Sequence, residues 1–82
     1  MKNYIVIVTN RDGQVCYVIH ENDIWRAAEQ AVRECVNYSQ VTRYESIELV
    51  EILNKFEQQG QFLNNMIQLN SGPQFLITIC QR

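Results

Sequence analysis

Both ends of the chain carry short apolar runs bounded by turn-forming residues. Residues 3–9 and 14–20 are rich in Val, Ile and Tyr, which favour strands, and Asn10-Arg11-Asp12-Gly13 separates them. This order predicts a β-hairpin, because the glycine accepts the positive φ that a tight turn needs. Near the end, residues 70–73 (NSGP) stop the preceding element, and residues 74–81 (QFLITICQ) predict a final strand.

A helical period follows the hairpin. Apolar residues between 24 and 36 recur on one side at about 100° per residue, with polar and charged residues on the other side. Asn22 or Asp23 can cap the first turn. The pattern predicts a helix over about residues 23–37.

The segment from 42 to 69 admits two interpretations. Its first apolar positions have the i, i+3, i+4, i+7 spacing of a helical stripe, namely Leu49, Ile52, Leu53 and Phe56. Thr42 and Glu45 have the spacing of a capping box. A second stripe follows Gly60, rotated from the first, and consists of Phe62, Leu63, Met66, Ile67 and Leu69. The rotation predicts two helices with a break near Gly60, whereas the alternative is a strand-turn-strand with residues 58–60 as the turn.

These elements predict one α+β domain over residues 1–82. The sheet is expected to be antiparallel and three-stranded, with two to three helices, in the order β-β-α-α-α-β. The alternative order is β-β-α-β-β-β, with a single helix.

The predicted strands are apolar on both sides. An antiparallel sheet with one wet face alternates apolar and polar residues, but each of these strands carries apolar residues at successive positions. In the first strand Tyr4, Val6 and Val8 face one way and Ile5 and Ile7 the other. In the second strand Val15, Tyr17 and Ile19 oppose Cys16 and Val18, and in the last strand Phe75, Ile77 and Ile79 oppose Leu76 and Cys80. Three short helices can wrap both faces, but a second apolar face in so small a chain equally suits another subunit or a target protein.

Composition narrows the classes of partner. The 82 residues are 46% hydrophobic and 20% charged, which is ordinary for a folded protein. A net charge of -2 provides no basic excess for phosphates, so direct nucleic-acid binding is not expected. The apolar run of residues 4–8 is too short for a membrane span or a signal-peptide core, which predicts a cytoplasmic protein without membrane association.

Catalytic and metal-binding patterns do not emerge. Cys16, Cys35 and Cys80 are odd in number and outside any CxxC motif, so reduced and mostly buried thiols are expected. Cys16 and His20 lie about 13 Å apart on an extended strand at about 3.3 Å per residue, too far for a nucleophile and its base. No metal or cofactor motif is present, and no enzymatic activity, cofactor or metal is predicted.

Two helical surfaces could bind a partner. Arg26, Gln30 and Arg33 share the polar side of the first helix, although Glu29 lies four residues before Arg33 and can neutralise it. Glu45, Glu48 and Glu51 recur every three residues and form an acidic ridge, of which Glu48 and Glu51 are the candidate contacts. Trp25 lies at the edge of the apolar arc and belongs either to the core or to such a contact.

The opening stretch, YIVIVTNRDGQVCYVIHENDIWRAAEQAV, resembles the hairpin-then-helix start of many small phage-encoded proteins, including some anti-CRISPR inhibitors of multisubunit CRISPR complexes. The N-terminal part of similar antitoxins has the same order. The resemblance implies a non-catalytic inhibitor or regulator that blocks a host defence complex, in the host cytoplasm, by occupying its surface. The partner is then a protein or a nucleoprotein complex. The alternative is a homodimeric structural or antitoxin-like module built on the spare sheet face.

Overall fold

The computed structural model describes residues 1–38, 41–61, 64 and 66–82. Four strands and two helices follow in the order β-β-α-α-β-β. They are β1 (Lys2–Asn10), β2 (Gly13–Glu21), α1 (Ile24–Asn37), α2 (Arg43–Gln59), β3 (Met66–Gln68) and β4 (Gln74–Gln81). The α+β class is confirmed, and the predicted hairpin, first helix and last strand are all present.

The four strands form one antiparallel sheet in the order β2-β1-β4-β3. Strand β1 therefore lies between β2 and β4, and the two ends of the chain meet, with the Arg82 amide donating to the Asn3 carbonyl at 2.8 Å. At the hairpin, the Asp12 amide donates to the Asn10 side chain at 2.9 Å, which fixes the turn.

The predictions of a three-stranded sheet and a third helix were wrong, and the alternative was right about a strand after Gly60 but wrong about a single helix, because residues 43–59 form α2. Residues 66–68 pair with β4 as the short strand β3, with Ile67 opposite Phe75. The exposed-buried-exposed pattern of Met66, Ile67 and Gln68 has the period of a strand, but three residues are too few for that period to show in the sequence. Two members of the predicted stripe, Phe62 and Leu63, lie outside the described residues.

Asn64 extends the cover of the β4 edge beyond β3. Its backbone amide donates to the Ile77 carbonyl at 3.0 Å, and its side-chain oxygen accepts from the Ile79 amide at 2.7 Å. Asn64 has a φ of 72°, a left-handed conformation that asparagine tolerates better than most residues. One side chain thus replaces a strand neighbour along this part of the edge.

Both helices begin at the caps that the sequence indicates. Asp23 accepts from the Arg26 amide at the start of α1, so Asp23 and not Asn22 is the cap. Thr42 and Glu45 form the full capping box of α2, each side chain accepting from the other's backbone amide. Gly60 ends α2 in the left-handed conformation, which confirms the predicted break.

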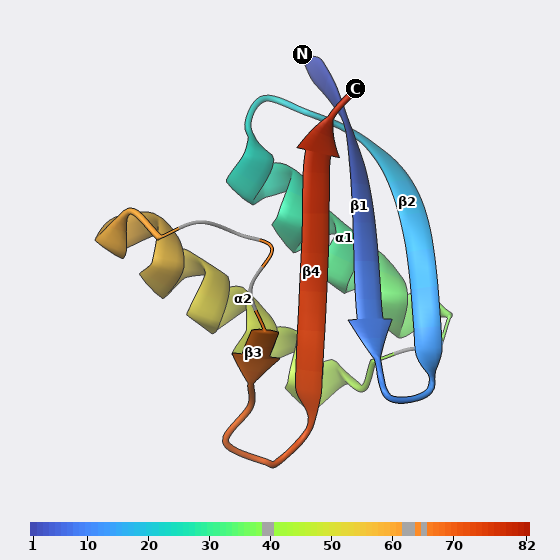
Figure 1. The fold of residues 1–82 in the computed structure, drawn as a ribbon, viewed down its shortest axis with the longest axis vertical. Helices are drawn as coiled ribbons and strands as arrows, with labels where there is room; N and C mark the ends of the chain where they lie inside the picture. The colour runs from blue at the N-terminus through green and yellow to red at the C-terminus, as the bar shows by residue number, and fades with distance from the viewer. Residues whose placement is uncertain (39–40, 62–63, 65) are drawn as a thin grey trace.

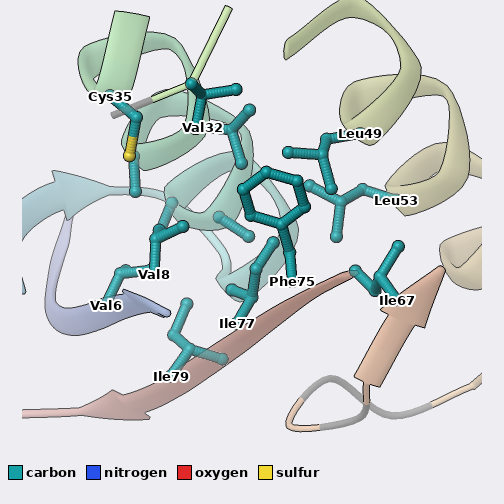
Figure 2. Packing of buried hydrophobic residues seen from close by; sticks show 14 of the residues in the cluster. Val6, Val8, Val32, Cys35, Leu49, Leu53, Ile67, Phe75, Ile77 and Ile79 are labelled. Carbon is teal, nitrogen blue, oxygen red and sulfur yellow. The ribbon is translucent and has the colours of Figure 1, made fainter. Parts of the chain in front are cut away.

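The core lies between the sheet and the helices. Val6 and Val8 of β1 and Phe75, Ile77 and Ile79 of β4 point toward the helices (Figure 2). The predicted apolar positions of the helices pack against these strand residues. The buried ones are Ala27, Ala28, Ala31, Val32, Cys35, Leu49 and Leu53. One face of the sheet and both helical stripes therefore form a single hydrophobic core.

Candidate interaction surface

Both helices cover the same side of the sheet. In Figure 1, α1 crosses behind β1 and β4, and the reader looks onto the side of the sheet that no described helix covers. Helix α1 contacts β1, β2 and β4, and α2 packs against α1. The expectation that helices could wrap both faces is thus not met within the described residues, and the second apolar face stays uncovered.

We call this uncovered side the open face and define its centre by eight uncharged residues. They are Ile5, Ile7, Cys16, Val18, Met66, Leu76, Thr78 and Cys80, all on strands. Strand alternation places them opposite the core residues, because successive side chains point to opposite sides. Val18 is 60% exposed and Met66 is 59% exposed, whereas Ile5, Ile7 and Leu76 are half-buried by their strand neighbours.

The strand register brings these side chains together. Ile7 of β1 lies between Cys16 of β2 and Thr78 of β4, and Ile5 lies between Val18 and Cys80. Side chains directly opposite one another on adjacent antiparallel strands lie about 5 Å apart at Cβ, so they form one continuous patch. The apolar residues are therefore neighbours across three strands and not isolated exposed side chains.

The centre of the open face carries no charged side chain from the described strands. The side chains that surround its centre are polar and mostly uncharged, namely Asn3, Thr9, Gln14, His20, Gln68 and Gln74. Within the described strands no Asp, Glu, Lys or Arg projects from this side, and the acidic residues lie on the helices, their caps, the hairpin turn and the inner side of β2. An apolar centre with an uncharged polar rim has the anatomy of a protein contact.

A shallow hollow continues the open face at one end. Its volume is about 760 Å³, and it lies between the β1-β2 turn and the β3-β4 turn. Leu76, Met66 and Thr9 line it together with Arg11 and Pro73. Because Leu76 and Met66 belong to both features, a protruding apolar side chain of a partner on the open face can enter the hollow.

The cysteines divide between the two sides of the sheet. Cys35 is buried in the core, but Cys16 and Cys80 are exposed on the open face, which corrects the expectation of mostly buried thiols. Burial raises the pKa of the Cys35 thiol. The Tyr17 hydroxyl is buried and, among the described residues, has only the Cys35 thiol as a hydrogen-bonding neighbour, and its burial raises the pKa of Tyr17 above its ordinary value of 10.0.

The predicted contact surface on the first helix is partly used inside the molecule. The Arg26 guanidinium donates to Glu29 at 3.0 Å and to Glu57 of α2 at 3.2 Å, and both carboxylates raise the pKa of Arg26. Glu29 therefore pairs with Arg26 and not with Arg33. Arg33 is exposed, Gln30 is half-buried, and Trp25 is half-buried against the core cluster.

Two of the three residues of the predicted acidic ridge also make contacts within the molecule. Glu45 closes the capping box of α2, and the Glu48 carboxylate accepts from the Asn70 amide in the turn before β4. Glu51 is exposed. Of the six residues predicted to bind a partner, Arg33 and Glu51 are exposed and take no part in the ion pairs and caps described above, and they lie on different helices.

The remaining candidate features among the described residues are a metal site, a Cys-His pair and a membrane-spanning helix. No three His, Cys, Asp or Glu side chains among the described residues converge to hold a metal ion. Cys16 and His20 lie on the same side of β2, four residues apart, as expected. None of the described helices is long and apolar enough to cross a bilayer.

Most of the open face was visible in the sequence as apolar residues out of phase with the core set. Thr78 follows from the same alternation once β4 is placed, but Met66 was missed because residues 61–69 had the period of a helix. No protein-family model, curated protein or solved structure matches the chain. The proposals below therefore depend on the geometry of the open face.

Proposed function

We propose that this chain is a non-catalytic protein-binding module whose contact surface is the open face. The single observation that supports it is an uncharged, mostly apolar patch spread over adjacent strands, on the side of the sheet opposite both helices. Contiguous apolar patches of this kind on a folded chain typically mark a contact with another protein.

The energetics favour a protein as the partner. Burying a Val, Leu, Ile or Met side chain completely is worth about 1.5–3 kcal/mol relative to leaving it in water. Val18 and Met66 are more than half exposed, so most of that gain is still available to an association. The flat, open sheet side fits a protein surface better than an enclosed small molecule.

The charged surfaces support the same proposal indirectly. Arg26, Glu45 and Glu48 are already engaged within the fold, which weakens the helix surfaces as primary contacts. An inhibitor or regulator that occupies the surface of another protein, as the resemblance to small anti-defence proteins implies, needs a contact patch and no catalytic residue.

The test compares one variant on the open face with one on a helix. Val18→Asp places a charge in the centre of the open face, and Tyr44→Asp makes the matched change at an 86% exposed position on α2. Native mass spectrometry of tagged protein from cells gives the mass and composition of whatever each variant carries. We expect the wild type and Tyr44→Asp in an assembly heavier than one tagged chain, and Val18→Asp as the free tagged chain.

Two results contradict the proposal. One is a wild-type chain that is free in the cell at the mass of one tagged chain, as is each variant. The other is an assembly that survives Val18→Asp and disappears with Tyr44→Asp, which would move the contact to the helix layer. Circular dichroism of each purified variant controls for the fold.

A further inference from the structure

We infer that the occupant of the open face is a second copy of this chain, packed sheet to sheet about a two-fold axis. This inference rests on the proposed function and names the partner. The contact buries Ile5, Ile7 and Val18 of each copy at its centre, with Leu76 and Met66 toward one end. Its product is a four-layer assembly, helices-sheet-sheet-helices.

Charge is the first argument for a second copy. A two-fold contact sets each patch against itself, so any charge near its centre would face a like charge. The eight central residues of the open face are uncharged, and the described strands place no carboxylate, ammonium or guanidinium group on that side. The net charge of -2 per chain thus stays on the outside of the pair, where water screens it. A charged heterologous partner would leave its own charges facing an apolar surface.

Shape is the second argument. The Cα trace measures 33 × 28 × 17 Å, so the molecule is a slab with the sheet on one broad side. Two twisted sheets pack well face to face at about 10 Å with their strands about 30° apart. The half-buried Ile5 and Ile7 then interdigitate with the more exposed side chains of the facing sheet.

The available area fits a weak, reversible dimer. Three strands of eight or nine residues are about 27 Å long at about 3.3 Å per residue, β3 with its three residues is about 10 Å long, and each strand is about 4.8 Å wide, which gives about 450 Å² per copy. Two copies bury about 900 Å² as a flat projection, just under the threshold of about 1,000 Å² for specific interfaces, before side-chain relief adds to it. The dimer is therefore expected to form at micromolar chain concentrations.

A dimer through the strand edges is the competing geometry. Strand β2 lies at the edge of the sheet, and two copies could pair there and continue the sheet. That contact would leave the open face in water. Thr78 separates the two arrangements, since it lies on β4, with β1 between it and β2.

Sedimentation equilibrium of the purified chain tests the inference, over about 5 to about 200 µM. The wild type is expected to move from 9.7 kDa toward 19.4 kDa (2 × 9.7 kDa) as its concentration rises. Val18→Asp and Thr78→Lys are each expected to stay at one chain, and Tyr44→Asp to dimerise like the wild type. A Thr78→Lys variant that still dimerises would overturn sheet-to-sheet packing in favour of the edge. Circular dichroism identifies a variant that fails to fold, and the other variant then decides.

The same samples separate failure of this inference from failure of the proposed function. A wild-type chain that is monomeric at every concentration, but is held in cells by another protein in a Val18-dependent complex, overturns the homodimer and leaves the protein-binding module standing. A chain that is monomeric in both settings overturns both. A Val18-sensitive homodimer in both settings supports both.

Discussion

The two sides of β1 carry similar residues in very different surroundings. Val6 and Val8 are completely buried beneath the helices, whereas their neighbours Ile5 and Ile7 are half-buried on the open face. Residue type does not explain the contrast, since all four are β-branched and apolar. The difference comes from what packs on each side, because α1 and α2 lie over one face only.

This contrast separates residues that the fold needs from residues that the fold leaves unexplained. The apolar inner face is accounted for by the core, where burial stabilises the domain. The apolar outer face contributes much less to the folded chain and exposes surface that water disfavours. The proposed partner would cover this surface and remove it from water.

The largest expected difference between the faces is produced by a buried charge. Val6→Asp places a carboxylate in the core at a position with 0% exposure and should leave the chain unfolded at neutral pH. Val18→Asp places the same group on the open face and should leave the fold intact. Circular dichroism compares them, and a folded Val6→Asp or an unfolded Val18→Asp would break the contrast.

Cavity formation should show the same contrast with a smaller magnitude. Ile77→Ala removes a fully buried side chain and should lower the free energy of unfolding by about 2–5 kcal/mol. Ile7→Ala removes the same atoms from the open face and should cost less than about 1.5 kcal/mol. Urea denaturation measures both changes in a Val18→Asp background, which is chosen to prevent the proposed dimer, and equal losses would contradict the account.

The capping box of α2 sharpens the description of the covered side. Thr42→Ala removes the side chain that accepts from the Glu45 amide and should lower the free energy of unfolding by about 1 kcal/mol. Thr42→Ser keeps the acceptor and is the matched control. Urea denaturation should show a loss for alanine alone, and a similar loss for serine would mean that the cap is not its cause.

The smallest effect concerns the inner-facing Tyr17. Among the described residues, its buried hydroxyl has only the Cys35 thiol, a weak hydrogen-bonding group, beside it, so Tyr17→Phe should change the free energy of unfolding by less than about 1 kcal/mol at neutral pH. The pKa of Tyr17 is higher in the folded state than in the unfolded state. Ionisation of Tyr17 therefore leaves the free energy of unfolding unchanged below pH 10.0 and lowers it as the pH rises above that value.

The pH dependence gives this prediction its test. Urea denaturation from about pH 8 to about pH 11 should show the wild type losing more stability than Tyr17→Phe over the alkaline part of the range. Cys35, whose pKa is also raised from 9.0, is present in both proteins and cancels in the comparison to first order. Parallel curves for the two proteins would show that the Tyr17 hydroxyl ionises as readily in the folded chain as in the unfolded one.

The parts of the fold that the sequence predicted are those with long periodic patterns or specific caps. Helix α1, the hairpin and β4 follow from such patterns, and the Thr42-Glu45 box identified the start of α2. A strand after Gly60 appeared only in the alternative interpretation, because three residues cannot establish a period and because the place of β3 depends on pairing with β4, a contact distant in sequence. Local pattern alone does not report such pairing.

The sequence predicted that a second apolar face exists, but it did not predict which side of each strand forms that face. The two apolar sides of each strand were visible as alternation, but which side the helices cover depends on how the elements pack. The charged residues chosen from helical spacing were less informative. Arg26 reaches Glu57, 31 residues away, and Glu48 reaches Asn70, and neither partner is visible from spacing along one helix.

The most direct test of the central claim is the thiol reactivity of the two faces. Cys16 and Cys80 lie on the open face and Cys35 in the core, so maleimide labelling followed by mass spectrometry reports on both faces in one protein. Cys35 should react slowly throughout. Cys16 and Cys80 should react fast in Val18→Asp at every concentration, but should be protected about tenfold in the wild type as its concentration rises to about 200 µM. Rates for these two thiols that are equal in the wild type and Val18→Asp, in purified protein and in cell extract alike, would show that the open face is not a contact surface.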